Sequence, residues 1–174
     1  MLEQLRQFDS KDHGRFKYRG VTIGRNTLFS AALLKPEATR WRQILYSCTR
    51  GGGTELIGTE LQSRAVDRRD DNAALLRAGY RNFNGLAVRV DILERFSAMA
   101  FKAAGQAQAE ADHELMSLLG GGVDSVAKVL NGLGYQTERG GEEGSRLLYR
   151  ARGKKQGVRK QERNSKSAKG TKRA

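Results

Sequence analysis

Residues 74–90 read ALLRAGYRNFNGLAVRV and residues 128–150 read KVLNGLGYQTERGGEEGSRLLYR, so one pattern occurs twice in the chain. Each stretch has the apolar spacing of a helix, then a Gly-Tyr pair, then a segment that returns as a strand. Glycine ends a helix well because it adopts the left-handed conformation without steric cost. The stretches are too short to establish a duplication. We expect each to be a fragment of a winged-helix-like unit.

The first copy is expected to belong to a helix–strand–helix unit. Asp70 or Asp71 can cap its helix, because an aspartate side chain accepts hydrogen bonds from the first turn. The strand should cover residues 86–90, and Asp91 with Glu94 is expected to form a capping box for the next helix. The apolar face of that helix should contain Leu93, Phe96, Ala100 and Ala103.

The second copy is expected to join two helices to a hairpin. Residues 110–119 have helical spacing, and three glycines at 120–122 break it. Asp124 or Ser125 should start the next helix. After the Gly-Tyr pair, residues 146–150 should form the second strand of a hairpin.

The N-terminal part is expected to be a hairpin followed by a helix. Residues 21–36 read VTIGRNTLFSAALLKP, with a basic turn between two apolar runs. Phe16 and Tyr18 extend the alternating pattern upstream, so we place them on or beside this hairpin. Pro36 suits the first helical position, where its missing N–H would be unpaired in any case. Apolar residues recur at helical spacing at Ala38, Trp41, Leu45 and Cys48.

The composition limits the class of protein. The chain has 174 residues, of which 38% are apolar and 21 are glycines, which suits one compact domain or two very small ones. Cys48 is the only cysteine, so we expect no internal disulfide, no cysteine-based zinc cluster, and a small buried thiol in a reducing compartment. No apolar run could span a bilayer and no signal segment precedes the body, so we expect a cytoplasmic protein without membrane contact.

The positive charge is concentrated at the C-terminus. The net charge is +13, and residues 150–174 hold eleven Lys and Arg against one acid, which gives this segment +10 and leaves +3 for residues 1–149. The segment after residue 151 has almost no large apolar side chain and cannot bury enough surface to order itself. We therefore expect a disordered polybasic tail over residues 151–174.

Residues suited to catalysis or cofactor binding are scarce. A phosphate-binding loop needs G-x-x-x-x-G-K-[ST], and neither glycine run is followed by Lys-Ser or Lys-Thr. Asp112, His113 and Glu114 are adjacent, but no second His or Cys lies at ligand spacing, so a solvated helix surface explains them better. We expect no enzyme, no metal and no cofactor.

The basic side chains favour a nucleic-acid partner. Cations on a flexible segment approach phosphates and release counterions, a driving force that ignores base sequence. Cations beside Phe16 and Tyr18 could hold a backbone while a ring stacks on a base, although aromatic residues at this spacing more often belong to a core. A tail that aids solubility or contacts acidic protein is the alternative. The candidate nucleic-acid-binding residues are Arg15, Lys17, Arg19, Arg25, Lys154, Lys155, Arg159, Lys160, Arg163, Lys166, Lys169, Lys172 and Arg173.

Three segments together resemble a known family. In chain order they are GVTIGRNTLFSAALLKPEATRWRQILYSC, AALLRAGYRNFNGLAVRVDILERF and ELMSLLGGGVDSVAKVLNGLGY. They resemble the C-terminal accessory region of alphaproteobacterial helicases related to the mitochondrial RNA-degradosome helicase, and the resemblance covers about residues 14–150. It implies an accessory role beside a motor. The Walker A lysine, the D-E-x-[DH] acids and the Q-x-x-G-R-x-G-R arginines of that motor have no counterpart here, so ATP hydrolysis does not carry over.

These observations predict a small α+β fold, mainly helical, with short hairpins. We divide the chain into an N-terminal extension (1–13), a hairpin-plus-helices unit (14–104), a helix-turn-helix plus hairpin unit (105–150) and the tail. The expected function is non-catalytic nucleic-acid binding, with RNA favoured over DNA. The alternative is a protein-interaction module that docks on, or completes, a separate ATP-dependent helicase motor.

Overall fold

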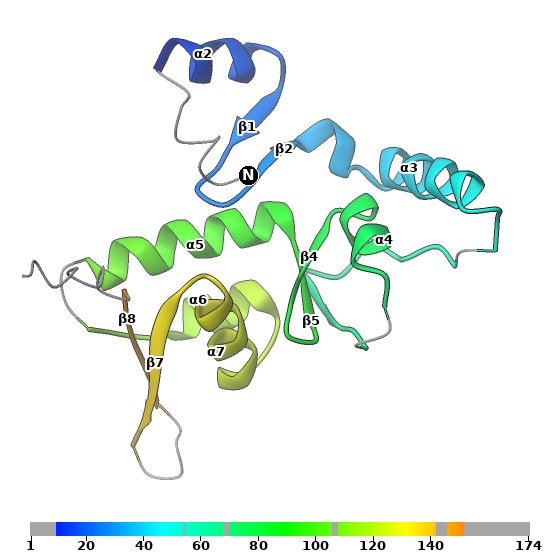
Figure 1. Ribbon diagram of the computed structural model, residues 1–174. Helices are drawn as coiled ribbons and strands as arrows, with labels where there is room; N and C mark the ends of the chain where they lie inside the picture. The colour runs from blue at the N-terminus through cyan, green and yellow to red at the C-terminus, as the bar shows by residue number, and fades with distance from the viewer. Residues whose placement is uncertain (1–9, 54, 68–69, 106–107, 142–145, 152–174) are drawn as a thin grey trace, which may run out of the picture.

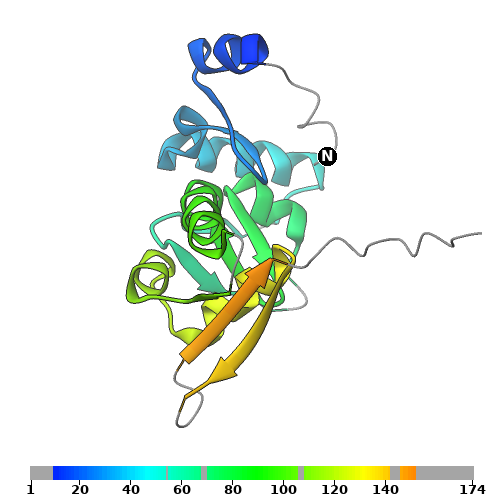
Figure 2. The ribbon, with the colours of Figure 1, turned by 90° about the vertical axis from the view of Figure 1, so that its left-hand side faces the viewer.

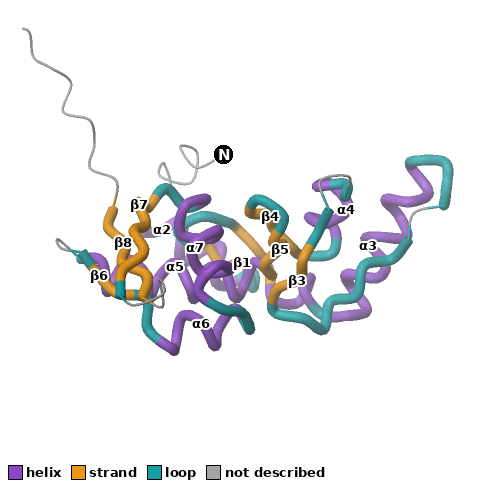
Figure 3. The backbone as a smooth tube through the Cα atoms, turned by 90° about the horizontal axis from the view of Figure 1, so that it is seen from below, coloured by secondary structure: helices purple, strands orange, loops and turns teal. Residues whose placement is uncertain are grey.

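The described residues form a mixed α+β structure of six α-helices and short antiparallel strand pairs, and the α+β class agrees with the prediction. The computed structural model describes residues 10–53, 55–67, 70–105, 108–141 and 146–151 (Figure 1). The expected tail lies almost wholly outside these ranges. Seen from below, the described part is elongated, with helix α3 (Pro36–Thr49) at one end and the sheet of β6 (Ala109–Glu110), β8 (Arg146–Ala151) and β7 (Tyr135–Gly140) at the other (Figure 3).

The N-terminal segment folds as a helix followed by a hairpin. Helix α2 covers Ser10–Tyr18, and strands β1 (Val21–Ile23) and β2 (Leu28–Ser30) pair antiparallel. Phe16 and Tyr18 therefore lie on a helix beside the hairpin, and the extension of the strand pattern to them was wrong. The helix ends just before Gly20, which takes a φ of +71° and so stops the helix ahead of β1. Figures 1 and 2 show helix α5 (Val90–Ala104) between this N-terminal segment and the later helices α6 (His113–Leu119) and α7 (Val123–Gly132).

A short 3-10 helix, η1 (Ala31–Leu34), leads into helix α3 (Pro36–Thr49), which starts with proline at its first position as predicted. The apolar stripe of α3 does not enter a core. Trp41 is 65% exposed and Leu45 64% exposed, while Thr39 and Gln43 are the buried side chains. Cys48 is exposed, so its prediction as a buried thiol was wrong. Helical periodicity identified an apolar face correctly but could not show that the described elements leave it uncovered.

The first Gly-Tyr stretch builds a three-stranded sheet with one helix. The elements are β3 (Ser63–Ala65), α4 (Asn72–Arg77), β4 (Tyr80–Phe83) and β5 (Leu86–Arg89), and the sheet order is β3–β5–β4. Asn84 and Gly85 both have positive φ, 49° and 88°, which is the two-residue hairpin turn that Asn-Gly favours. Leu75, Ala78, Tyr80 and Ala87 form a small core here.

The second stretch repeats this order with more helices. Helix α5 (Val90–Ala104) is followed by β6 (Ala109–Glu110), α6 (His113–Leu119), α7 (Val123–Gly132), β7 (Tyr135–Gly140) and β8 (Arg146–Ala151). The sheet order is β6–β8–β7, the same relation of strands as in the first sheet. The larger core lies between α5, α6, α7 and this sheet, with Phe96, Leu119, Leu130 and Tyr149 at 1% exposure or less.

The Gly-Tyr pairs act as predicted in both units. Gly79 ends α4 with a φ of +86° and Gly134 follows α7 with a φ of +92°. In each case the next tyrosine opens a strand that pairs with the last strand of its sheet. The shared sequence pattern thus corresponds to a shared path of the backbone.

Several predicted helix starts need correction. Asp71 caps α4 by accepting from the Ala73 N–H at 2.8 Å, as expected. The capping box of Asp91 and Glu94 was wrong, because α5 begins one residue earlier than Asp91. Asp91 instead pairs with Arg89 at 2.7 Å, since its side chain lies inside the first turn.

The later helices also start elsewhere than predicted. Glu110 belongs to β6, and Asp112 caps α6 by accepting from the Leu115 N–H. Gly122 is the N-cap of α7, so neither Asp124 nor Ser125 starts that helix. On α5 it is Ala104, not Ala103, that joins the buried face. Within the described residues, no helix is both long and apolar enough to cross a membrane.

Candidate nucleic-acid interface

Three of the four predicted body cations lie on or just after α2. Arg15 has an 82% exposed side chain and lies 3.9 Å from Asp12. Lys17 and Arg19 are also exposed. Between them in sequence, Tyr18 is 93% exposed, so this short helix presents an aromatic side chain among cations rather than a core residue.

The fourth cation, Arg25, lies at the other end of the hairpin. Its guanidinium carbon is 3.4 Å from the centroid of the Phe101 ring on α5, an arrangement in which cation and ring attract. Burial raises the pKa of Tyr135 on β7, and the charge of Arg25 opposes that rise. Arg25 therefore joins the hairpin to α5 and does not join the cations of α2.

One carboxylate holds the turn that carries Arg25. Glu94 accepts hydrogen bonds from the N–H of Arg25 at 2.7 Å, the N–H of Asn26 at 2.9 Å and the hydroxyl of Thr27 at 2.8 Å. The same carboxylate occupies the space that a Cβ at Gly24 would need. The sequence therefore places glycine where the turn meets α5.

A hollow of about 810 Å³ lies between this turn and the β4–β5 hairpin. The lining is rich in amide side chains and includes one cation; among its residues are Asn26, Asn72, Asn82, Asn84, Arg81 and Leu76. Asn82 donates to Asn72 at 3.1 Å and accepts from the Gly85 N–H at 3.1 Å. The side-chain amide of Asn82 is therefore already engaged in hydrogen bonds to Asn72 and within the β4–β5 turn.

A second group of cations surrounds Tyr46 on α3. The guanidinium carbons of Arg77 and Arg50 lie 4.9 and 5.8 Å from the Tyr46 ring centroid. The Tyr46 hydroxyl donates to Asp71 at 2.8 Å. That hydrogen bond raises the pKa of Tyr46 and lowers the pKa of Asp71.

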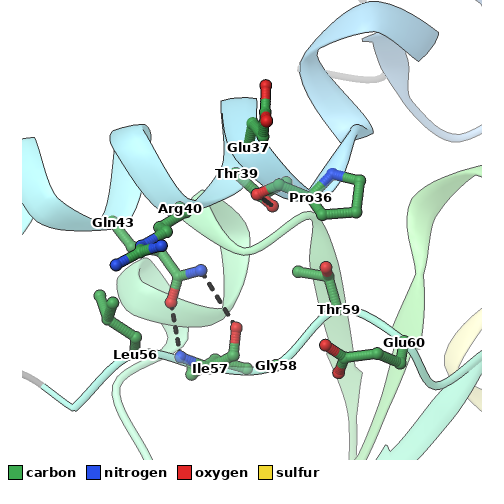
Figure 4. Close-up of a pocket in the computed structure, with 10 residues that line it drawn as sticks. All are labelled: Pro36, Glu37, Thr39, Arg40, Gln43, Leu56, Ile57, Gly58, Thr59 and Glu60. Atoms are coloured by element: carbon green, nitrogen blue, oxygen red, sulfur yellow. Dashed lines mark hydrogen bonds between the residues drawn. The ribbon is translucent and has the colours of Figure 1, made fainter.

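A smaller cleft of about 280 Å³ lies between α3 and the segment 55–60 (Figure 4). Gln43 crosses it, donating to the Ile57 carbonyl at 3.1 Å and accepting from the Ile57 N–H at 2.7 Å. Because both ends of the amide are engaged, the cleft is a structural joint. Glu37, Arg40 and Glu60 at its edge form no group suited to acid–base chemistry.

The remaining predicted features have simple structural roles or fall outside the described ranges. Asp112 is a helix cap, and the described residues contain no group of three His, Cys, Asp or Glu able to hold a metal ion. The nine tail cations from Lys154 to Arg173 lie outside the residues that the structure describes.

Sequence reasoning missed two parts of this surface. It undervalued Tyr18, because a pair of aromatic residues two positions apart favoured a strand with a buried face. It also overlooked the cations around Tyr46, although Arg42, Tyr46 and Arg50 recur every four residues and so share one face of a helix. Comparisons with protein-family models, with curated proteins and with solved structures find no match.

Proposed function

We propose that this protein binds nucleic acid, RNA in preference to DNA, without catalysing a reaction. The observation that carries the proposal is the 93% exposure of Tyr18 beside the exposed cations Lys17 and Arg19. Backbone-directed binding to a single strand combines cations that track phosphates with an aromatic face on which a base stacks. Burial would have removed the ring from that role.

Two features of the sequence support the same function. The C-terminal segment adds a charge of +10, which favours salt-dependent, sequence-independent contact with phosphates. The resemblance to a helicase accessory region favours RNA, and a cytoplasmic location belongs to this proposal. We further propose that the two Gly-Tyr units are winged-helix-like. Helix α7 exposes only Lys128 as a cation, so we assign it to packing rather than to groove reading.

Salt-dependent filter binding to a single-stranded RNA of about 16 nucleotides tests the proposal. Tyr18→Ala should weaken binding about tenfold, the loss expected for one stacked base. Lys17→Gln with Arg19→Gln should lower the slope of log affinity against log salt by about 1.4, or 0.7 for each phosphate contact. Arg95→Gln with Lys128→Gln removes the same charge from exposed sites elsewhere and should lower the salt slope by less.

Truncation after Ala151 separates the tail from the body. The shortened chain should bind RNA more weakly at low salt, and the remaining affinity should still depend on Tyr18. Wild-type protein that does not bind single-stranded RNA, or whose affinity does not respond to salt, would contradict the proposal. Equal loss in the α2 variants and the charge-matched control would remove α2 from the interface.

A second candidate function rests on a different observation. The stripe of α3 formed by Trp41 and Leu45 is exposed, and Leu33 nearby in sequence is 50% exposed. Apolar side chains gathered on one uncovered face favour contact with another protein. We propose that this face docks on a separate helicase motor.

Co-purification with an ATPase tests the docking function. Trp41→Ser with Leu45→Ser should abolish the pairing and leave the fold intact, because both side chains are exposed. Truncation after Ala151 should leave the pairing unchanged. Pairing that depends on the tail and ignores the α3 stripe would contradict this candidate.

A further inference from the structure

Helix α3 carries a repeat of polar side chains on the side that packs against α4. Arg42 and Tyr46 lie on α3 four residues apart, about 6 Å along the helix axis, and Arg50 is the C-cap residue that follows the helix. Arg77, at the end of α4, lies over the Tyr46 ring. Figure 1 shows α3 and α4 as neighbours at the end of the molecule away from β7 and β8. The guanidinium groups of Arg50 and Arg77 therefore lie near the ring of one tyrosine, and Arg42 precedes that tyrosine by one turn of α3.

The innermost of these groups is only partly satisfied. The Nε and Nη2 atoms of Arg42 are buried and have no hydrogen-bond partner among the described residues. Nη2 lies 4.0 Å from the point that a Cβ of Gly79 would occupy, so the guanidinium reaches the turn after α4. A buried N–H of a charged group without an acceptor costs free energy. The charge of this guanidinium, unpaired among the described residues, favours an anion nearby.

The neighbouring charges point in the same direction. Burial, and then the charge of Arg77, holds the pKa of the Arg42 guanidinium below its usual value. Asp71 is the acid whose pKa responds to Arg50, and its carboxylate already accepts from the Tyr46 hydroxyl and the Ala73 N–H. The group therefore keeps a surplus of positive charge, which a bound anion would offset.

Tyr46 holds two of the cations in position. A guanidinium that lies over an aromatic ring keeps the N–H groups at its edge available for hydrogen bonds. The hydroxyl bond to Asp71 fixes the ring, and the ring in turn orients Arg50 and Arg77. Planar guanidinium groups bind two oxygens of a phosphate at once.

We infer that Arg50 and Arg77, both held against Tyr46, form a phosphate-binding site on the folded body, and that Arg42 on the preceding turn of α3 adds to its positive charge. Its ligand in the cell is a backbone phosphate of the nucleic acid, an assignment that rests on the proposed function. The site lies on α3 and α4, apart from the cations of α2. It gives the body a second anchor point for a strand that α2 or the tail also holds.

The first experiment uses inorganic phosphate and the full-length protein. The melting temperature should rise by a few degrees in about 20 mM phosphate relative to chloride at equal ionic strength, because a ligand that binds the folded state stabilises it. Arg50→Gln with Arg77→Gln should abolish this rise; both side chains are exposed, so the variant should fold. Arg95→Gln with Lys128→Gln is the charge-matched control and should keep the rise.

The second experiment measures single-stranded RNA binding by the same proteins. Loss of two phosphate contacts should make the affinity deficit of the site variant about sevenfold larger at 50 mM than at 200 mM salt, since each contact contributes about 0.7 to the salt slope. A lost phosphate response with unchanged RNA affinity would support the site and assign it to free phosphate. An equal phosphate response in the site variant and the control would overturn the inference. Failure of wild-type protein to bind RNA would affect only the proposed function.

Discussion

Glu94 shows how much of the architecture one side chain can decide. Its carboxylate accepts three hydrogen bonds from the β1–β2 turn, and these bonds join segments that are about seventy residues apart in the chain. Hydrogen bonds to a charged acceptor are stronger than those between neutral groups. The position of the hairpin, and with it α2, therefore depends on this acid.

Replacing Glu94 with alanine should release the hairpin from α5. We expect the free energy of unfolding to fall by about 2–4 kcal/mol, because turn donors lose a charged acceptor. Trypsin should also cut faster at Arg25. Urea denaturation and limited proteolysis measure the two effects, with Glu114→Ala at an exposed site of α6 as the control. An unchanged cleavage rate at Arg25 would show that other contacts hold the turn.

Gln43 is a second residue that stabilises the fold through its hydrogen bonds. It is 5% exposed and satisfies both backbone groups of Ile57. Gln43→Leu should lower the free energy of unfolding by about 1–3 kcal/mol, since the N–H and carbonyl of Ile57 would lose their acceptor and donor. Gln108→Leu, at an exposed site, should change it by less than about 0.5 kcal/mol. Equal effects of the two substitutions in urea denaturation would contradict this role.

At the scale of elements, the two helix stops offer a matched comparison. Both Gly79 and Gly134 have positive φ, but a Cβ at Gly79 would meet the Leu34 side chain at 2.7 Å, whereas a Cβ at Gly134 would meet open space. Gly134→Ala should cost about 1–2 kcal/mol from backbone strain alone. Gly79→Ala should cost more, because it adds overpacking of about 1–3 kcal/mol. Thermal unfolding of the two variants measures the difference in stability. A larger loss of stability in Gly134→Ala than in Gly79→Ala would contradict this prediction.

The elements also show why the fold was only partly predictable. The Gly-Tyr stops, the helix beginning at Pro36 and the strand 146–150 depend on local backbone preferences, and these are written in short stretches of sequence. The helix at residues 10–18 was missed because two aromatic positions are too few to separate a period of two from a helical period. The role of Glu94 was predicted wrongly, because a capping box and a long-range hydrogen-bond acceptor both require an acidic residue.

At the scale of the whole molecule, a buried tyrosine lies in each of the two cores. Tyr80 is fully buried in the smaller core and Tyr149 is 1% exposed in the larger. Burial raises the pKa of Tyr80, and it is the main reason that the pKa of Tyr149 rises to about 12. Ionising either phenol therefore works against the folded state.

Tyr149 gives a testable contribution to the stability of the molecule at alkaline pH. The folded pKa of Tyr149 lies above its unfolded value of about 10, so its contribution is present below about pH 10 and is lost as pH rises toward 12. The free energy of unfolding should fall over this window. In Tyr149→Phe the fall should be shallower, whereas Tyr18→Phe at an exposed site should match wild type. Urea titration at each pH measures the free energy of unfolding. A parallel decline of that free energy in wild type and Tyr149→Phe would contradict the assignment.

The candidate interface was less predictable than the fold. Arg15, Lys17, Arg19 and Arg25 were selected for charge, and the structure separates Arg25 from the other three, because a hairpin lies between them. The exposure of Tyr18 depends on how α2 is placed, which short sequence patterns do not encode. The cations around Tyr46 required the packing of α3 on α4, two elements whose contact is a tertiary property.

The exposure of Cys48 gives the chain a useful spectroscopic handle. It is the only thiol in the sequence and lies on the solvent side of α3, one helical turn beyond Leu45. A maleimide dye would therefore attach at a single position without any cysteine being engineered. Its emission would report directly on whether another macromolecule covers that end of the protein.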